Sequence, residues 1–254
     1  MEEKIKKSHQ KEVVIDINNL QKAFGTEKIL INLNLQLFKQ ENLVVLGKSG
    51  SGKSVLIKLI VGLLAADGGS INVLNQEVTQ IKQKELAELR QKIGFLFQSG
   101  ALYDSMSVRQ NLEFPLQRIR KELNAKQREA KIIEVLENVG LADAIDKMPS
   151  QLSGGMRKRI GLARTIVVDP IIMLYDEPTT GLDPTTSKEI SELILEVQKK
   201  YKTASIIITH DIACARIVAN RLVMLQDGKV YKEGDLKAFE TSDDPIIQSF
   251  FKSI

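Results

Sequence analysis

Apolar and polar positions along the chain predict strands of two kinds. Apolar residues alternate with polar ones in residues 33–37 and toward the end of residues 13–17, which is typical of half-buried antiparallel strands. Residues 43–46 form a short apolar run with polar flanks, as expected of a strand that is covered on both faces. Further strand candidates lie at residues 71–73, 93–97, 171–175, 205–209 and 222–225.

Helical spacing dominates the middle of the chain. Ile132, Val135, Leu136 and Val139 lie on one face of a helix, and Gly140 stands where that helix would stop. A second helix is predicted after Ser153, a plausible N-cap, because apolar residues recur at 156, 160, 163 and 167. Positions 190, 193, 194 and 197 predict a third.

Strands that alternate with helices indicate an α/β fold. The simplest organisation is a βαβ core that is interrupted by a mostly helical segment, about 87–168. Residues 235–254 predict one or two short helices. Since no repeat with a period of 20–50 residues is visible, a solenoid is excluded.

The composition supports one large domain, or one with a sizeable insertion. The chain has 254 residues, of which 43% are hydrophobic and 27% charged, so global disorder and a fibrous fold are excluded. No membrane-spanning helix is expected, because the best apolar stretch, residues 55–66, is too short and contains Lys58. Residues 1–12 carry four lysines and no apolar run, which predicts a flexible arm rather than a secretory signal. Cys214 is the single cysteine and allows no internal disulfide.

The strongest chemical signal is a glycine-rich loop between an apolar strand and an apolar helical run. Its residues are Gly47, Lys48, Ser49, Gly50, Ser51, Gly52, Lys53 and Ser54, which fit the pattern G-x-x-x-x-G-K-[ST]. Glycines let backbone N–H groups turn toward phosphate oxygens, and the helix that begins near Lys53 adds its positive dipole end. Lys53 is expected to reach the β- and γ-phosphates and Ser54 to bind Mg²⁺.

A second element delivers carboxylates at the end of an apolar strand. Residues 171–175 are followed by Asp176, which could hold Mg²⁺, and by Glu177, which could polarise an attacking water as general base. His210 follows the apolar strand 205–209, and beside the other motifs it predicts a contact with the γ-phosphate.

The segment Leu152-Ser153-Gly154-Gly155-Met156-Arg157-Lys158-Arg159 resembles the signature motif of ATP-binding cassette (ABC) ATPases. Other positions then match this family's order from about residue 13 to 235. Phe24 matches the aromatic that stacks on adenine, Gln98 the Q-loop glutamine, Asp183 the D-loop aspartate and His210 the switch histidine. One departure is Thr180-Gly181, where many cassettes have Ser-Ala before Leu-Asp, and this difference bears on communication across a dimer.

The resemblance implies a P-loop NTPase (RecA-like) core with an antiparallel β subdomain and a helical signature subdomain, all within residues 13–235, followed by a tail at 236–254. It implies hydrolysis of ATP with Mg²⁺, in which Ser54, Gln98 and Asp176 hold the metal, and Glu177, His210 and Gln98 serve catalysis. It also implies a head-to-tail dimer with a second copy, in which Ser153, Gly154, Gly155 and Asp183 contact nucleotide bound by the partner.

Three further features resemble the ATPase subunits of Mla/Mce-type lipid transport systems. These are the run FQSGALYDSMSVRQNLEFPL at 97–116, Met156 in the signature, and the tail at 242–251. This resemblance implies an ATPase that drives phospholipid movement between the inner membrane and a periplasmic Mce-domain partner. The chain would then lie in the cytoplasm, on the inner face of the membrane, held there by an integral-membrane permease subunit.

Two alternatives stay open. The chain could serve another importer or exporter, for a small solute or for lipoprotein release. It could also be a soluble cassette that acts on nucleic acid or ribosomes, but such chains resemble tandem cassettes or carry long coiled coils, whereas this one has one P-loop, one signature and no sustained heptads. No nucleic-acid partner is therefore expected.

Overall fold

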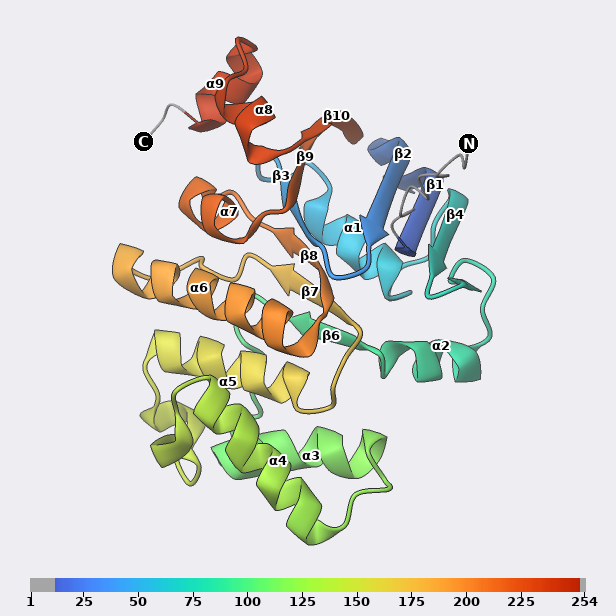
Figure 1. Cartoon of the computed structure of the whole chain (residues 1–254). Helices are drawn as coiled ribbons and strands as arrows, with labels where there is room; N and C mark the ends of the chain where they lie inside the picture. Colours follow the sequence, from blue (N-terminus) through green and yellow to red (C-terminus); the bar gives the residue numbers. More distant parts are fainter. Residues whose placement is uncertain (1–11, 252–254) are drawn as a thin grey trace, which may run out of the picture.

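The computed structural model describes residues 12–251, in which two sheets and a group of helices pack together (Figure 1). Apart from Glu12, the predicted N-terminal arm lies outside this range, as do the last three residues of the predicted tail. The four-stranded antiparallel sheet has the order β2-β1-β4-β5 and consists of β1 (Val13–Phe24), β2 (Glu27–Phe38), β4 (Gly68–Val73) and β5 (Gln76–Glu77).

The six-stranded sheet has the order β10-β9-β3-β8-β7-β6. It consists of β3 (Asn42–Leu46), β6 (Ile93–Leu96), β7 (Ile172–Asp176), β8 (Ala204–Ile208), β9 (Arg221–Gln226) and β10 (Lys229–Gly234). Strands β9, β3, β8, β7 and β6 run parallel, and β10 is antiparallel to β9. Their parallel direction brings the carboxyl ends of β3, β7 and β8 to one edge, where loops can gather functional groups.

The helices lie on both sides of this sheet. They are α1 (Lys53–Ile60), α2 (Gln83–Arg90), α3 (Val108–Ile119), α4 (Ala125–Asn138), α5 (Gly154–Ile166), α6 (Pro184–Tyr201), α7 (Ile212–Val218), α8 (Leu236–Glu240) and α9 (Pro245–Phe251), with single 3₁₀ turns at Ala142–Ala144 and Pro149–Gln151. Within residues 12–251, no helix is both long enough and apolar enough to cross a membrane.

The sheet separates two hydrophobic cores, because successive residues of a strand point to opposite faces. In β3, Val44 and Leu46 join the core that is completed by α3–α9, whereas Leu43 and Val45 join the core under α1, α2 and the antiparallel sheet. Every residue of β3 and β8 is therefore buried. This explains why residues 43–46 form a continuous apolar run, as the sequence indicates.

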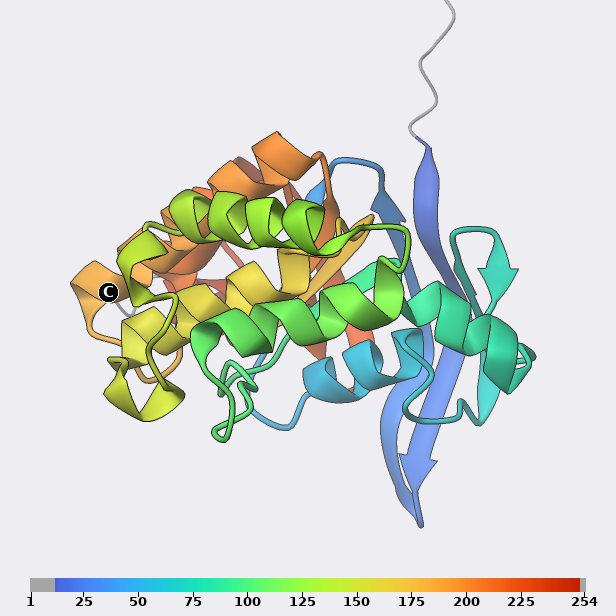
Figure 2. The same cartoon turned by 90° about the horizontal axis from the view of Figure 1, so that it is seen from below.

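Helices α3, α4 and α5 pack against one another as a lobe, in which α3 and α4 lie on the side that faces the viewer in Figure 2. Ser153 caps α5 by accepting a hydrogen bond from the N–H of Met156, as its position before the apolar repeat predicts. The expected helical segment 87–168 also contains β6, which belongs to the six-stranded sheet. The lobe itself therefore starts at Val108.

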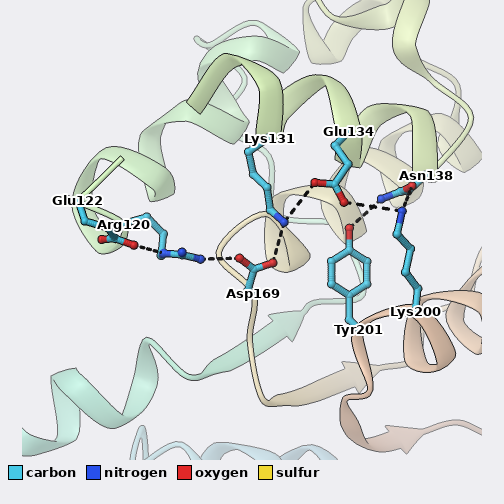
Figure 3. Close-up of polar contacts among 8 residues, drawn as sticks. All are labelled: Arg120, Glu122, Lys131, Glu134, Asn138, Asp169, Lys200 and Tyr201. Atoms are coloured by element: carbon cyan, nitrogen blue, oxygen red, sulfur yellow. Dashed lines mark hydrogen bonds and ion pairs between the residues drawn. The ribbon is translucent and has the colours of Figure 1, made fainter. Parts of the chain in front are cut away.

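A polar network joins this lobe to the rest of the molecule (Figure 3). Asp169 lies in the turn between α5 and β7. It forms ion pairs with Arg120, which follows α3, and with Lys131 of α4. On the next turns of α4, Glu134 faces Lys200, and Asn138 donates to the hydroxyl of Tyr201 at 2.8 Å. Lys200 and Tyr201 end α6, so the network connects α4 to two elements of the core.

The strand boundaries differ from the sequence-based expectation in two ways. Strands β1 and β2 extend over 12 residues each, because they form a long ribbon whose outer parts are exposed. The sequence does not predict β5 and β10. Strand β5 is only two residues long, and β10 is an edge strand with the mostly polar sequence KVYKEG. Of the one or two short helices expected in residues 235–254, two are present, α8 and α9.

Candidate functional site

A cavity of about 680 Å³ opens at the edge of the sheet where β3, β7 and β8 end. Residues that the sequence singles out supply most of its lining: Lys48, Ser49, Gly50, Gly52, Lys53, Ser54, Gln98, Asp176, Glu177 and His210. Four further residues also line the cavity, although their sequence positions do not identify them as site residues: Glu27, Ile29, Val55 and Thr180. The folded chain thus brings together loops that lie far apart in the sequence.

The glycine-rich loop between β3 and α1 requires glycine at two positions for steric reasons. Gly52 has a positive φ of 94° and forms the N-cap of α1, and a Cβ there would lie 2.8 Å from the side chain of Leu30. A Cβ on Gly47 would lie 2.7 Å from the carbonyl oxygen of Leu225. Neighbouring segments therefore pack closely against the loop at both glycines. The N–H groups of such a loop and the start of the following helix are groups that can bind an anion.

Lys53 is the first residue of α1, and only 7% of it is exposed. Its Nζ donates hydrogen bonds to the carbonyl oxygens of Gly47 at 2.7 Å and Lys48 at 2.9 Å, so the side chain folds back along the loop. Burial lowers the pKa of Lys53, and the nearby carboxylates of Glu177 and Asp176 oppose that shift. The Nζ of Lys53 is thus held within the loop by its two carbonyl partners.

Ser54 and Asp176 meet across the cavity although they come from α1 and β7. The Ser54 hydroxyl donates to Oδ1 of Asp176 at 3.1 Å. A hydroxyl and a carboxylate are oxygen ligands of the kind that Mg²⁺ prefers, and Mg²⁺ usually takes only one or two such protein ligands. The donor set therefore fits the expected Mg²⁺, and Gln98 lines the same cavity. No group of three or more His, Cys, Asp or Glu side chains that could hold a metal occurs in the described part of the chain.

Glu177 directly follows β7 and adopts left-handed backbone geometry, with a φ of 51°. Its N–H donates to the carbonyl oxygen of Ile208 at 2.9 Å, which fixes the turn against β8. The Glu177 carboxylate accepts a hydrogen bond from the Thr180 hydroxyl at 3.2 Å and lies 2.8 Å from Nδ1 of His210. Its side chain is 15% exposed, whereas that of His210 is 63% exposed. A carboxylate so held can accept a proton from a water in the cavity.

Lys158 of α5 also reaches this turn. It is 6% exposed, and its Nζ donates to the backbone carbonyl oxygen of Glu177 at 3.3 Å. Lys158 belongs to the signature segment, but its place in the sequence indicates no role for it. Helical spacing did not reveal it either, since a lysine in an otherwise polar stretch is usually exposed.

Several predicted residues do not line the cavity. Phe24 ends β1 with 48% of its surface exposed, and Nζ of Lys22 lies 5.4 Å from its ring centre. Ser51 lines a neighbouring cavity, and Gly47 contributes its carbonyl to Lys53. Gly47 and Ser51 thus belong to the loop without lining its main cavity, and Phe24 is not among the lining residues of that cavity.

The signature residues and Asp183 lie together outside the cavity, at the starts of α5 and α6. Asp183 caps α6 by accepting from the N–H of Thr186 at 3.0 Å. A Cβ on Gly155 would lie 2.6 Å from Cγ2 of Thr186, so the two helix starts are in close contact. Ser153, Gly154, Gly155 and Asp183 therefore form one patch with two helix N-termini, but this patch does not contact the cavity of the same chain.

Comparison with known proteins identifies the same family for most of the chain. Residues 30–180 match the family model described as ABC transporter. The probable ribonucleotide transport ATP-binding protein mkl of Mycobacterium tuberculosis is 40% identical over 238 residues, which is 94% of this chain and 66% of that protein. The chloroplastic protein trigalactosyldiacylglycerol 3 of Arabidopsis thaliana is 37% identical over 94% of this chain and 73% of its own length. The glutamate/aspartate import ATP-binding protein GltL of Escherichia coli is 38% identical over 91% of this chain and 94% of its own length.

Solved structures have the same fold. A dimeric ATP-binding cassette in a post-hydrolysis state with ADP and Pi has a TM-score of 0.79 and 31% identity, covering 87% of this chain and 98% of that one. The Clostridium perfringens cassette cbiO1, part of the ABC transporter complex cbiONQ, has a TM-score of 0.82 and 26% identity, with coverage of 95% and 92%. The present chain spans 66% of the length of the Mycobacterium tuberculosis relative, slightly less than two thirds, and 68% of the length of the Mycobacterium leprae relative. From the family match, the relatives and the shared fold, we conclude that this chain belongs to the ABC transporter family and has the P-loop NTPase fold of its ATP-binding cassettes.

Proposed function

We propose that the chain binds ATP with Mg²⁺ and hydrolyses it in the cavity at the ends of β3, β7 and β8. The observation that carries this proposal is the pairing of Ser54 with Asp176 at 3.1 Å, beside the buried ammonium of Lys53 and the carboxylate of Glu177. A phosphate-binding loop, a donor set for Mg²⁺ and a carboxylate base thus line one space. The structural relative with ADP and Pi supports the same activity.

Each residue has a distinct part in the proposed reaction. The N–H groups of the loop and the start of α1 bind phosphate oxygens, and Lys53 neutralises their charge. Ser54, Asp176 and Gln98 would hold Mg²⁺, which when bound offsets charge on the β- and γ-phosphates. Glu177 accepts a proton from the attacking water, and His210 holds the Glu177 carboxylate in place. Phe24 would stack on the adenine from the end of β1.

The patch at the starts of α5 and α6 suggests a second copy of the chain as partner. Ser153, Gly154 and Gly155 present the N-terminus of α5, which suits an anion, and Asp183 lies beside them at the start of α6. None of these residues lines the cavity of its own chain. A head-to-tail dimer would place this patch against nucleotide that is bound by the other copy. The dimeric form of the structural relative supports this arrangement.

Hydrolysis is tested by measuring phosphate release from ATP by the full-length chain, with Mg²⁺ and with a chelator. We expect release that depends on Mg²⁺ and a dimer that forms with ATP. Absence of phosphate release both from the isolated chain and from the chain purified with its membrane subunits would refute the ATPase assignment.

For the transported substrate we propose a phospholipid, moved between the inner membrane and a periplasmic Mce-type partner. An integral-membrane permease subunit would hold the chain on the cytoplasmic face. Support comes from the run at 97–116, from Met156 and from the tail, and from a relative whose name contains that of a galactolipid. An amino-acid importer is the second candidate, because GltL is 38% identical over almost its whole length.

Purification of the tagged full-length chain from detergent-solubilised membranes separates the two candidates. A permease that co-purifies with an Mce-domain protein and bound phospholipid would support lipid transport. A permease that co-purifies with a soluble amino-acid-binding protein, and without any Mce-domain protein, would refute it.

A further inference from the structure

Lys158 is a buried lysine that contacts the catalytic turn from the signature helix. It lies in α5, five residues after Ser153. Within residues 12–251, Lys53 and Lys158 are the two buried lysines. Lys53 belongs to the phosphate-binding loop, whereas Lys158 has no part in the reaction as described above.

Burial of Lys158 has a cost that packing alone does not explain. Burial lowers the pKa of Lys158, and the carboxylates of Glu177 and Asp176 oppose that shift. A buried ammonium usually contributes less to stability than an apolar side chain of similar volume. Methionine has a similar length and would avoid that desolvation cost. The lysine is therefore better explained by what it contacts than by the stability of the core.

Its contact is with the backbone of the proposed general base. The ammonium donates to the Glu177 carbonyl at 3.3 Å, while the N–H of Glu177 is bound to Ile208 at 2.9 Å. Thr180 and His210 hold the carboxylate itself. Within the turn, the Glu177 carbonyl also accepts from the N–H of Thr180 at 3.3 Å. Lys158 is therefore the partner of this carbonyl that comes from a different element.

The same turn of α5 also contacts the loop that follows Gln98. Gly100 packs so closely that a Cβ there would lie 3.2 Å from the carbonyl oxygen of Arg157, the residue before Lys158. At its start, α5 carries Ser153 and packs on α6 through Gly155. A displacement of α5 would therefore reach the signature patch, the Gln98 loop and Glu177 together.

We propose that Lys158 is a positioning residue that ties the signature helix to Glu177, so that the orientation of the base depends on where α5 lies. This inference rests on the proposed ATPase function. It predicts that loss of the hydrogen bond to the Glu177 carbonyl slows hydrolysis without weakening the binding of ATP, since Lys158 does not line the nucleotide cavity.

The test compares three variants of the full-length chain. Lys158→Met removes the donor and keeps the length, Lys158→Gln keeps an N–H donor without the charge, and Lys199→Met removes an exposed lysine of α6 as the matched control. Phosphate release gives kcat, fluorescent ATP gives the Kd, and thermal unfolding gives the Tm. We expect kcat of Lys158→Met to fall about tenfold or more, with an unchanged Kd and a Tm no lower than that of the unaltered chain. Lys158→Gln should retain an intermediate kcat.

Two results would overturn the inference. One is a kcat of Lys158→Met within twofold of that of Lys199→Met. The other is a parallel loss of kcat, ATP affinity and Tm in both Lys158 variants, which would show a purely structural role. A failure of the proposed function is a different outcome, because then the unaltered chain would release no phosphate either.

Discussion

Nδ1 of His210 lies 2.8 Å from Oε2 of Glu177, joining the loop after β8 to the end of β7. The histidine is largely exposed and the carboxylate is largely buried, and both line the same cavity. Because Glu177 has hydrogen-bonding partners on its N–H, its carbonyl and its carboxylate, its role can be tested by a change that keeps its shape.

Glu177→Gln should leave ATP binding intact and slow phosphate release by about 100-fold or more, since an amide cannot serve as the general base. A dimer should then accumulate with ATP, as measured by gel filtration. Glu196→Gln, an exposed site on α6, is the control and should behave like the unaltered chain. Hydrolysis by Glu177→Gln at close to the unaltered rate would show that another group is the base.

Lys53→Ala should abolish ATP turnover and raise the nucleotide Kd by about tenfold or more, because the buried ammonium neutralises phosphate charge in the loop. Isothermal titration and phosphate release measure the two effects. Lys58→Ala removes an exposed lysine from the same helix and should leave both unchanged. Unchanged turnover in Lys53→Ala would refute the assignment of the phosphate-binding loop.

Asp176→Asn should raise the Mg²⁺ concentration needed for half-maximal hydrolysis and lower kcat about 100-fold, since an amide is a weaker ligand than a carboxylate. Binding of ATP without Mg²⁺ should hardly change. Asp143→Asn, at an exposed position in a 3₁₀ turn, is the control. A normal Mg²⁺ titration for Asp176→Asn would exclude Asp176 as a ligand.

Asp169→Asn tests the network between the helical lobe and the core. Asparagine tolerates the φ of 55° at this turn, so the change removes two ion pairs without straining the backbone. We expect the free energy of unfolding to fall by about 1 kcal/mol at low salt and by less at high salt. Glu122→Gln breaks one exposed pair with Arg120 and should cost less. An equal or larger loss in Glu122→Gln would contradict a central role for Asp169.

Cys214 predicts a pH dependence of stability. Burial raises the pKa of the Cys214 thiol from about 9 to about 12. Its contribution to stability is complete below the pKa of the unfolded chain and is lost as the pH rises from about 9 toward 12, because only the unfolded thiol ionises there. Denaturant titrations at several pH values should show a shallower decline for Cys214→Ala. In addition, iodoacetamide should not modify the folded chain at pH 8, but should react once denaturant is added.

The sequence predicts the core of the fold well, because both faces of the six-stranded sheet are covered. Burial on both faces forces an apolar run in β3 and β8, and such runs are visible without a structure. Edge elements lack that constraint. Strand β10 is held by pairing with β9, but most of its side chains are polar and none is fully buried, so it lacks the apolar run of a central strand.

The residues of the candidate site also differ in how far the sequence predicts them. Residues whose spacing is dictated by one loop, such as Gly52 and Lys53, can be recognised from the sequence. Contacts between distant elements cannot, because the pairing of Ser54 with Asp176 or of Lys158 with Glu177 depends on how α1, α5 and β7 pack. The signature patch shows a third case, since its residues are recognisable although they do not line the cavity of their own chain.

The left-handed backbone of Glu177 sets stability and activity against each other at one position. A non-glycine residue in this region costs about 1–2 kcal/mol relative to glycine, and the fold accepts that cost where the carboxylate is needed. Glycine there would relieve this backbone cost, but it would remove the carboxylate and its contacts with Thr180 and His210. Stability and the proposed activity therefore make opposing demands on the backbone at one position, that of the proposed general base.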